Sequence, residues 1–153
     1  MDPWFIVSAA PEESRLIRTA REVNDGKPEW VIEKVKLAVA EYLQANPAKT
    51  AKDVTIACYG LAFKPDIDDL RESPALAITR RIASTHPGPV WAVEPHVEML
   101  TDSLANLFVL KSTEEASSRA DIKVLLVDHR QFKELRMPQG KVLDFKGIWI
   151  KKN

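Results

Sequence analysis

The sequence predicts an α/β fold in which a doubly wound, mainly parallel sheet of five strands follows two helices. Three observations predict it. Short apolar runs rich in β-branched residues alternate with helix-like segments over residues 53–150. Capping residues and proline-rich stops separate these segments. A wide apolar stripe at helical spacing precedes them, within residues 28–45. Strands that alternate with helices favour parallel pairing, because each crossover passes through a helix.

Residues 1–46 predict two helices. The first begins near Pro11, a residue suited to the first helical position, and stops at Asn24-Asp25-Gly26. The second runs from about Pro28 to Ala45. Its apolar stripe consists of Val31, Ile32, Val35, Ala38, Val39, Tyr42 and Leu43. A stripe of this width must be buried, and the sequence leaves open whether it packs on the same chain, on another domain or on a partner subunit.

Five strands are predicted in the remainder, which the polar linker 46–50 separates from the helices. They cover residues 54–60, 90–93, 108–110, 123–128 and 141–144. Ser73-Pro74 supplies an N-cap and a first-turn proline for the helix after the first strand, and His86-Pro87-Gly88-Pro89 ends that helix. The later helices are expected over about 96–104, 112–119 and 130–136. This order of elements is Rossmann-like.

Ligands of such sheets bind beyond the carboxyl ends of the strands. The candidate loops are 60–73, 94–97, 111–113, 128–131 and 144–148. The first is unusually long, since strand-to-helix loops usually have about 2–6 residues. It carries Lys64 and Arg71 and leads into a helix N-terminus, an arrangement that favours phosphate. The loop therefore predicts an anion or nucleotide site, and the alternative is a solvated loop with local salt bridges.

Composition excludes several classes of function. The 22 basic and 22 acidic side chains cancel, so nucleic acid and anionic membrane surfaces are not expected partners. No apolar run is long enough to cross a membrane, and no signal peptide pattern is present. The one cysteine, Cys58, lies within a predicted strand and is expected to be a buried core residue. These features favour a cytoplasmic protein.

Other polar residues allow two interpretations. Glu94 ends the second strand, where nucleotide-binding folds often place a ribose-binding acid, and it is otherwise a loop carboxylate. The three histidines, His86, His96 and His129, are far apart in the sequence and lack the spacing of metal ligands, so no metal site is expected.

The run Gly-Leu-Ala-Phe-Lys-Pro-Asp-Ile-Asp-Asp-Leu-Arg-Glu-Ser-Pro-Ala, residues 60–75, resembles the C-terminal signature of the UDP-glucose/GDP-mannose dehydrogenase family. The part Ile-Asp-Asp-Leu-Arg-Glu-Ser-Pro is most similar to the subgroup that oxidises UDP-N-acetyl-D-mannosamine. Residues 1–7 resemble the stretch after the family's catalytic cysteine motif, and residues 18–25 resemble the start of its central helical region. The resemblance covers essentially the whole chain.

The resemblance implies an NAD-dependent 6-dehydrogenase that oxidises a sugar C6 alcohol to a carboxylate. It implies that residues 1–46 are a remnant of a central helical dimerisation domain and residues 47–153 a C-terminal UDP-sugar-binding domain. The catalytic cysteine and the NAD domain would precede Met1, so this chain alone is expected to be inactive. The expected partners are a UDP-sugar and either a second copy, through helices 11–45, or a separate N-terminal half.

Residue roles follow from the same resemblance. Asp2 matches an active-site aspartate, and Phe63 and Lys64 match residues that contact the UDP-sugar. Arg71 matches a residue that reaches NAD from the C-terminal domain. Lys146 falls near the position of a substrate-binding arginine. The alternative is a stand-alone nucleotide-binding or assembly module without catalysis, which docks through the apolar stripe of residues 28–45.

Overall fold

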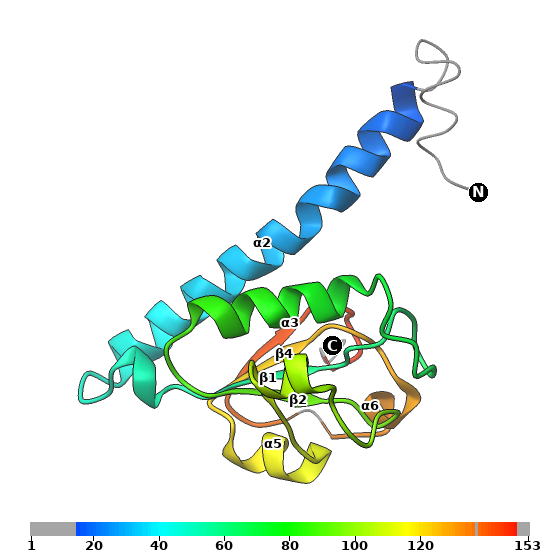
Figure 1. Cartoon of the computed structure of the whole chain (residues 1–153). Helices are drawn as coiled ribbons and strands as arrows, with labels where there is room; N and C mark the ends of the chain where they lie inside the picture. Colours follow the sequence, from blue (N-terminus) through cyan, green and yellow to red (C-terminus); the bar gives the residue numbers. More distant parts are fainter. Residues whose placement is uncertain (1–14, 137, 150–153) are drawn as a thin grey trace.

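A five-stranded parallel sheet forms the centre of the protein (Figure 1). The computed structural model describes residues 15–136 and 138–149, with side chains from residue 27 onward. The strands lie in the order β3-β2-β1-β4-β5, and every neighbouring pair is parallel. Their bounds are β1 Ile56–Tyr59, β2 Val90–Val93, β3 Val109–Leu110, β4 Ile122–Leu125 and β5 Lys141–Asp144. The predicted fold class is confirmed.

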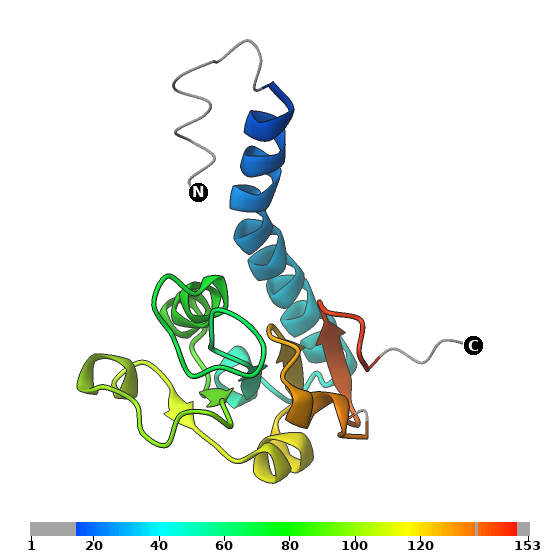
Figure 2. The same cartoon turned by 90° about the vertical axis from the view of Figure 1, so that its right-hand side faces the viewer.

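Helices cover both faces of the sheet, as a doubly wound fold requires. Helices α2 and α3 lie on one face, while α5 and α6 lie on the other (Figures 1 and 2). The helices are α2 Arg15–Ala45, the short 3₁₀ helix η1 Ala51–Asp53, α3 Pro74–Thr85, α4 Asp102–Ala105, α5 Thr113–Arg119 and α6 Arg130–Lys133. The N-terminal half of α2 extends away from the sheet in both views.

The predicted interruption at residues 24–26 is wrong, because α2 is one continuous helix with Pro28 inside it. Asn, Asp and Gly lower helix propensity by up to about 1 kcal/mol each, which is a weak preference that the rest of a long helix can override. A proline removes one hydrogen bond within a helix but does not always end it. The predicted start near Pro11 lies outside the described residues.

The caps predicted from sequence are confirmed. Ser73 is the N-cap of α3, and its hydroxyl accepts a hydrogen bond from the backbone N–H of Leu76. His86 ends the same helix. The helix expected over 96–104 is shorter than predicted, since α4 begins only at Asp102. The preceding segment is a turn in which the backbone N–H of Val97 donates to the carbonyl of Glu94.

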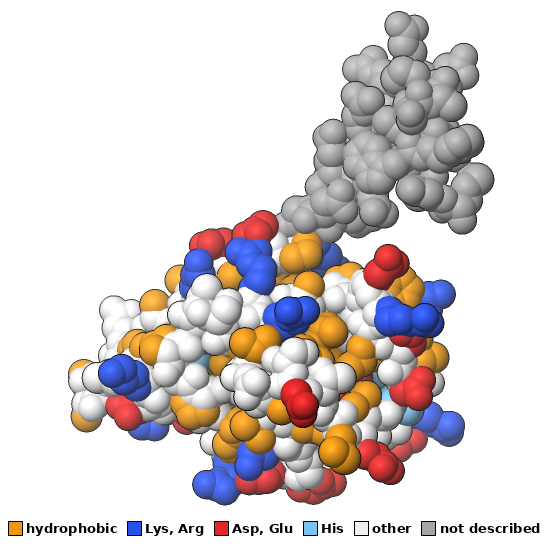
Figure 3. Space-filling model, in the orientation of Figure 1, with side chains coloured by type: hydrophobic (Ala, Val, Ile, Leu, Met, Phe, Trp, Pro, Cys, Tyr) orange, Lys and Arg blue, Asp and Glu red, His pale blue; other side chains and the backbone are white. Residues whose placement is uncertain are grey.

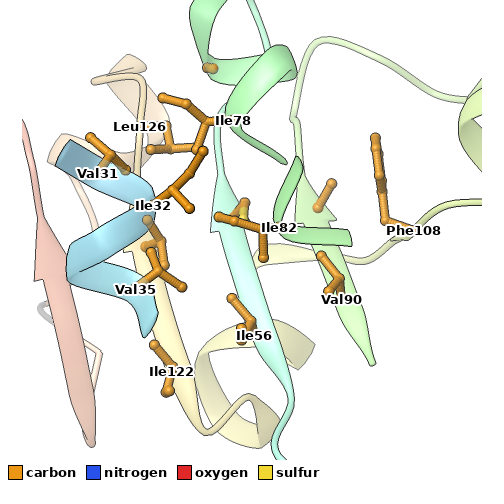
Figure 4. Close-up of a cluster of buried hydrophobic side chains, with 14 of the residues drawn as sticks. Val31, Ile32, Val35, Ile56, Ile78, Ile82, Val90, Phe108, Ile122 and Leu126 are labelled. Carbon is orange, nitrogen blue, oxygen red and sulfur yellow. The ribbon is translucent and has the colours of Figure 1, made fainter. Parts of the chain in front are cut away.

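The larger core lies between the sheet and helices α2 and α3. In Figure 4, Val31, Ile32 and Val35 of α2 point toward side chains of the sheet and of α3. Their exposed fractions are 1–3%. This face of α2 therefore packs on its own chain. The opposing residues that Figure 4 labels are Ile56, Ile78, Ile82, Val90, Phe108, Ile122 and Leu126.

A second core fills the other face of the sheet. Its members come from the strands, from α5 and α6, and from the segment after β5: Ala57, Tyr59, Val93, Ala116, Ala120, Leu125, Phe132 and Trp149. The rings of Tyr59 and Trp149 meet edge to face at 5.1 Å between centroids. The indole N–H of Trp149 donates to the carbonyl of Phe132. These contacts tie the segment after β5 to the sheet.

The surface mixes both signs of charge. In the face shown in Figure 3, basic and acidic side chains are interspersed. This agrees with the formal net charge of zero and gives no broad basic area on that face for a polyanion. None of the helices in the described part of the chain is long and apolar enough to cross a membrane.

Candidate functional site

The candidate site lies where the chain order of the strands reverses. From the central strand β1 the chain proceeds to β2 and β3 on one side, and β4 and β5 follow on the other side. The loops after β1 and β4 therefore leave the sheet at a topological switch point, where doubly wound folds bind ligands. The backbone N–H groups of Leu126 and Val127 both donate to the carbonyl of Tyr59, so the two strand ends are held together.

A cleft of about 560 Å³ opens beside this point, between α2, the N-terminus of α3 and the loop after β5. Two cationic side chains, Lys27 and Lys146, line it from opposite elements. The remaining lining is mostly apolar: Pro28, Val31, Glu72, Ser73, Pro74, Ala75, Ala77, Ile78, Leu126 and Phe145. Apolar walls with a few charged groups are typical of small-molecule sites.

The N-terminus of α3 adds positive potential to this cleft. Ser73 and Pro74 are the N-cap and first residue of this 12-residue helix, and both line the cleft. The first backbone N–H groups of a helix lack intrahelical acceptors and carry the positive end of its dipole. Together with the two lysines, they make the cleft suitable for an anionic ligand.

Lys146 is held in the cleft by a turn that Asp144 organises. One carboxylate oxygen of Asp144 accepts hydrogen bonds from the N–H groups of Lys146 and Gly147, at 2.9 and 2.7 Å. The other oxygen accepts from the N–H of Trp149 at 2.6 Å. Trp149 is itself buried in the second core. The backbone at Lys146 is thus fixed from β5 on one side and from the core on the other.

A second cleft of about 490 Å³ is formed by the loop after β1. Phe63, Asp69, Arg71 and Glu72 line it, and Glu72 also lines the first cleft, so the two are neighbours. The Phe63 side chain is exposed, and the ammonium of Lys64 lies 5.8 Å from the centre of its ring. The loop thus presents an aromatic face and a cation at the mouth of this cleft.

Arg71 is paired within the same loop. Its guanidinium donates two hydrogen bonds to Asp69, at 3.0 and 3.1 Å, and its backbone N–H donates a third. These bonds hold the pKa of Asp69 below its ordinary value and raise that of Arg71. The loop after β1 therefore contains a local salt bridge, as the alternative interpretation of this loop predicts. Arg71 stays highly exposed, so its charge is accessible to a ligand.

Glu94 is neither a ribose-binding acid in an open loop nor a solvated carboxylate, because its side chain is completely buried. One oxygen accepts hydrogen bonds from the backbone N–H groups of Leu61 and Ala62, both at 3.0 Å, and from Nε2 of His129 at 2.8 Å. The other accepts from the N–H of His96 at 3.1 Å. Burial alone raises the pKa of Glu94, but these hydrogen bonds outweigh it and lower the pKa.

Two of the three histidines, His96 and His129, lie closer together than their spacing in the sequence suggests. The rings of His96 and His129 lie 4.8 Å apart, and one ligand atom each of Asp66, His96 and His129 fall within 4.8 Å of one another. Both ring nitrogens of His129 already have protein partners, Glu94 and the N–H of Asp66. An ion bound by His129 would therefore have to displace one of these hydrogen bonds.

Comparison with known proteins identifies the chain. Residues 57–151 match the model of the UDP-glucose/GDP-mannose dehydrogenase family, UDP binding domain. The chain belongs to this family. The match begins within β1 and includes the long loop, the second cleft, the segment after β5 and the lining of the first cleft apart from its α2 residues.

Curated members of the family align with nearly the whole chain. The UDP-N-acetyl-D-mannosamine dehydrogenase of Yersinia pestis is 55% identical over 152 residues, which are 97% of this chain and 36% of the relative. The NDP-N-acetyl-D-galactosaminuronic acid dehydrogenase of Ralstonia solanacearum is 50% identical over 155 residues, which are 99% of this chain and 34% of the relative. The chain thus spans about a third of the length of the curated relatives it matches.

Solved structures of family members share the fold. A UDP-N-acetyl-mannosamine dehydrogenase from S. aureus superposes with a TM-score of 0.72 at 30% identity, over 99% of this chain and 34% of that one. A UDP-D-ManNAc dehydrogenase from Pyrococcus horikoshii gives a TM-score of 0.69 at 28% identity, over 99% of this chain and 34% of that one. The dehydrogenase family predicted from residues 60–75 is confirmed.

The predicted site residues within the described part of the chain lie at the two clefts. Phe63 and Arg71 line the second cleft, with Lys64 beside Phe63, whereas Lys146 lines the first. Asp2 lies outside the described residues. Sequence reasoning missed Lys27, because that lysine was placed between two predicted helices, at a distance of 119 residues in the sequence from Lys146. It also missed the buried pairing of Glu94 with His129, 35 residues apart.

Proposed function

We propose that this chain binds the UDP-sugar substrate of an NAD-dependent UDP-N-acetyl-D-mannosamine 6-dehydrogenase, which oxidises the sugar C6 alcohol to a carboxylate. One observation carries the proposal. A cleft at the N-terminus of α3 is lined by Lys146, from the part of the chain that matches the family's UDP binding domain, and by Lys27 of α2. A diphosphate needs such convergent positive charge. The 55% identity to the UDP-N-acetyl-D-mannosamine dehydrogenase of Yersinia pestis supports this choice of sugar.

Each predicted residue has a role within this proposal. Lys146 and the N-terminus of α3 bind the diphosphate in the first cleft. Phe63 and Lys64 contact the nucleotide sugar from the loop after β1, where the exposed aromatic ring offers a stacking face. Asp2, as in the sequence-based prediction, belongs to the catalytic centre of the whole enzyme.

NAD supplies hydride acceptance in such a dehydrogenase. The loop after β1 has no G-x-G-x-x-G pattern, so the described part of the chain does not offer a complete dinucleotide-binding turn. Arg71 fits a cofactor contact, because its guanidinium is highly exposed and lines the second cleft. We therefore propose that this chain contributes one cationic contact to NAD and no more of its binding site.

The proposal extends to assembly and location. Trp30 and Leu37 of α2 are about half exposed, while Val31, Ile32 and Val35 of the same helix are buried. We propose that the helical region 11–45 also forms the homodimer contact or docks an N-terminal half. The single buried thiol, Cys58, suits a reducing cytoplasm, which is the location we propose for this biosynthetic enzyme.

The competing function is a stand-alone binding or assembly module without catalysis. Such a module would have the same nucleotide site, but it would dock to a full-length dehydrogenase and would not form part of a catalytic enzyme. Sedimentation of the purified chain with and without a full-length relative tests this module, because a module of this kind must associate with that relative through α2, and a chain that stays monomeric would count against it. A Leu37→Glu change should weaken such association without unfolding the chain, since Leu37 is exposed.

Calorimetric titration of UDP into the chain tests the proposed site. Lys64→Ala and Lys146→Ala should each weaken UDP binding by about tenfold, because each removes a cationic contact to the nucleotide worth roughly 1.5 kcal/mol. Lys52→Ala is the matched control, since this exposed lysine of η1 lies at the opposite end of β1. Equal effects of all three variants, or none, would contradict the proposed site.

A further inference from the structure

Two anchored backbone groups flank the side chains that face the proposed ligand. The N–H of Ala62 donates to Glu94, and the N–H of Asp66 donates to Nδ1 of His129 at 2.9 Å. Phe63 and Lys64 lie between these two points and are exposed. The position of both exposed side chains therefore depends on two residues that no ligand can touch, because the Glu94 and His129 side chains are completely buried.

The hydrogen bonds determine the tautomer of the His129 ring. Nδ1 of His129 accepts from the N–H of Asp66, so it must carry a lone pair, and the ring proton sits on Nε2. Nε2 then donates to the Glu94 carboxylate, which also accepts the N–H groups of Leu61 and Ala62. A neutral imidazole and an ionised carboxylate satisfy every one of these bonds.

Asp66 makes a second contact that joins the loop after β1 to the segment after β4. Asp66 adopts a left-handed backbone conformation with φ of 64°. Its carboxylate accepts a hydrogen bond from the N–H of Arg130 at 2.7 Å. Asp66 is therefore bound to His129 and to Arg130, the next residue in the chain. These two contacts, from outside the loop, hold the left-handed conformation of Asp66. Such a conformation is uncommon outside glycine and persists where surrounding contacts determine it.

We propose that Glu94 and His129 are positioning residues for the nucleotide-sugar site. They fix the loop from Leu61 to Asp66 and thereby aim Phe63 and Lys64 at the ligand. The inference rests on the proposed function, which supplies the ligand, whereas the anchoring itself can be measured without one. A loop that is fixed before binding does not lose its conformational entropy on binding, and this preorganisation raises affinity.

The test uses Glu94→Gln in the whole chain, with Glu98→Gln as the matched control because Glu98 is exposed in the turn that follows. Glutamine keeps the shape of the side chain but removes its charge. Both oxygens of Glu94 accept hydrogen bonds, so the NH₂ group of the glutamine would face an N–H donor that it cannot bind. Amide exchange should accelerate at least tenfold at Leu61, Ala62 and Asp66 in this variant, with no comparable change at Val124 of β4 or in Glu98→Gln. Unchanged exchange at the three loop amides would overturn the anchoring.

A double-mutant cycle on UDP affinity distinguishes positioning from general destabilisation. Glu94→Gln should weaken UDP binding about tenfold, and Lys64→Ala should then add less than twofold, because the lysine is no longer aimed. Full additivity of the two effects would overturn the positioning role. If the unaltered chain does not bind UDP while the loop amides respond as expected, the anchoring is confirmed and the proposed function of this chain fails.

A spectroscopic signature gives independent evidence. The ¹⁵N resonances of His129 should show a protonated Nε2 and an unprotonated Nδ1 near neutral pH. Glu94, Asp66 and His96 are the titratable groups that face this ring, from the end of β2, the loop after β1 and the turn after β2. An Nδ1–H tautomer or a doubly protonated ring would contradict the network, because neither can accept the N–H of Asp66.

Discussion

A side chain on Gly60 would collide with Val127, since an ideal Cβ at Gly60 lies only 2.5 Å from the Cβ of Val127 and 2.9 Å from its backbone nitrogen. Gly60 directly follows β1, and Val127 follows β4, so this contact lies at the switch point of the sheet. Gly60 also has φ of 98°, a conformation that favours glycine. The close approach of two backbones allows both loops to begin at the same place, and it explains why a glycine opens the signature at residues 60–75.

Gly60→Ala is expected to destabilise the fold by about 3–5 kcal/mol, from backbone strain together with the clash. Gly147→Ala is the matched control. Gly147 also has positive φ, at 75°, but nothing lies within 4 Å of its Cβ position. This control should cost only about 1–2 kcal/mol. Urea denaturation measures both, and similar losses in the two variants would refute the steric role of Val127.

Acid should destabilise the protein partly through Glu94. The folded state lowers the pKa of this carboxyl below its ordinary value of 4.5. The ionised form therefore contributes stability that is fully present above pH 4.5 and is lost as the pH falls through the lower folded value. Glu94→Gln has no such titration, so its urea midpoint should change less between pH 5 and pH 3 than that of the unaltered chain. Parallel pH profiles would disprove this contribution.

The sequence predicted those parts of the fold that depend on neighbouring residues. Ser73-Pro74 and the stop at His86 define α3 through local capping, and both ends are confirmed. The run Val90–Val93 is apolar and short, and it forms β2 over the residues predicted. The helical break at residues 24–26 was wrong, because weak helix formers set a preference that a long helix overrides.

The candidate site was only partly predictable, for a related reason. Phe63, Lys64 and Arg71 lie within one loop, so a single segment of sequence identified them. The Glu94–His129 bond joins residues from different strand ends, and nothing in the spacing of 35 residues signals it. In the sheet, β2 and β4 both lie next to β1. The buried acid after β2 and the buried histidine after β4 therefore come together beyond the end of β1, which the order of the residues in the sequence does not show.

Cys58 should resist thiol reagents in the folded chain. Burial raises the pKa of its thiol to about 12, and the side chain is fully buried in β1. At pH 8 roughly one thiol in ten thousand is then ionised, and the thiolate is the reactive form. Labelling with a chromogenic disulfide should be slow in buffer and fast in urea. Rapid labelling of the folded chain would contradict the buried position.

The second half of α2 should behave as part of the sheet domain. Ile32→Ala should cost about 2–5 kcal/mol in urea denaturation, because Ile32 is only 3% exposed and packs between α3 and the sheet. Leu37→Ala is the control on the same helix, and it should stay within about 0.5 kcal/mol because Leu37 is 52% exposed. Equal, small losses would instead mean that α2 is detached in solution, and the boundary predicted at residue 46 would then separate two independent units. A large loss of stability in Ile32→Ala, with little loss in Leu37→Ala, would mean that the second half of α2 stays packed on the sheet. The helix then forms one side of the first cleft, through Lys27 and Val31.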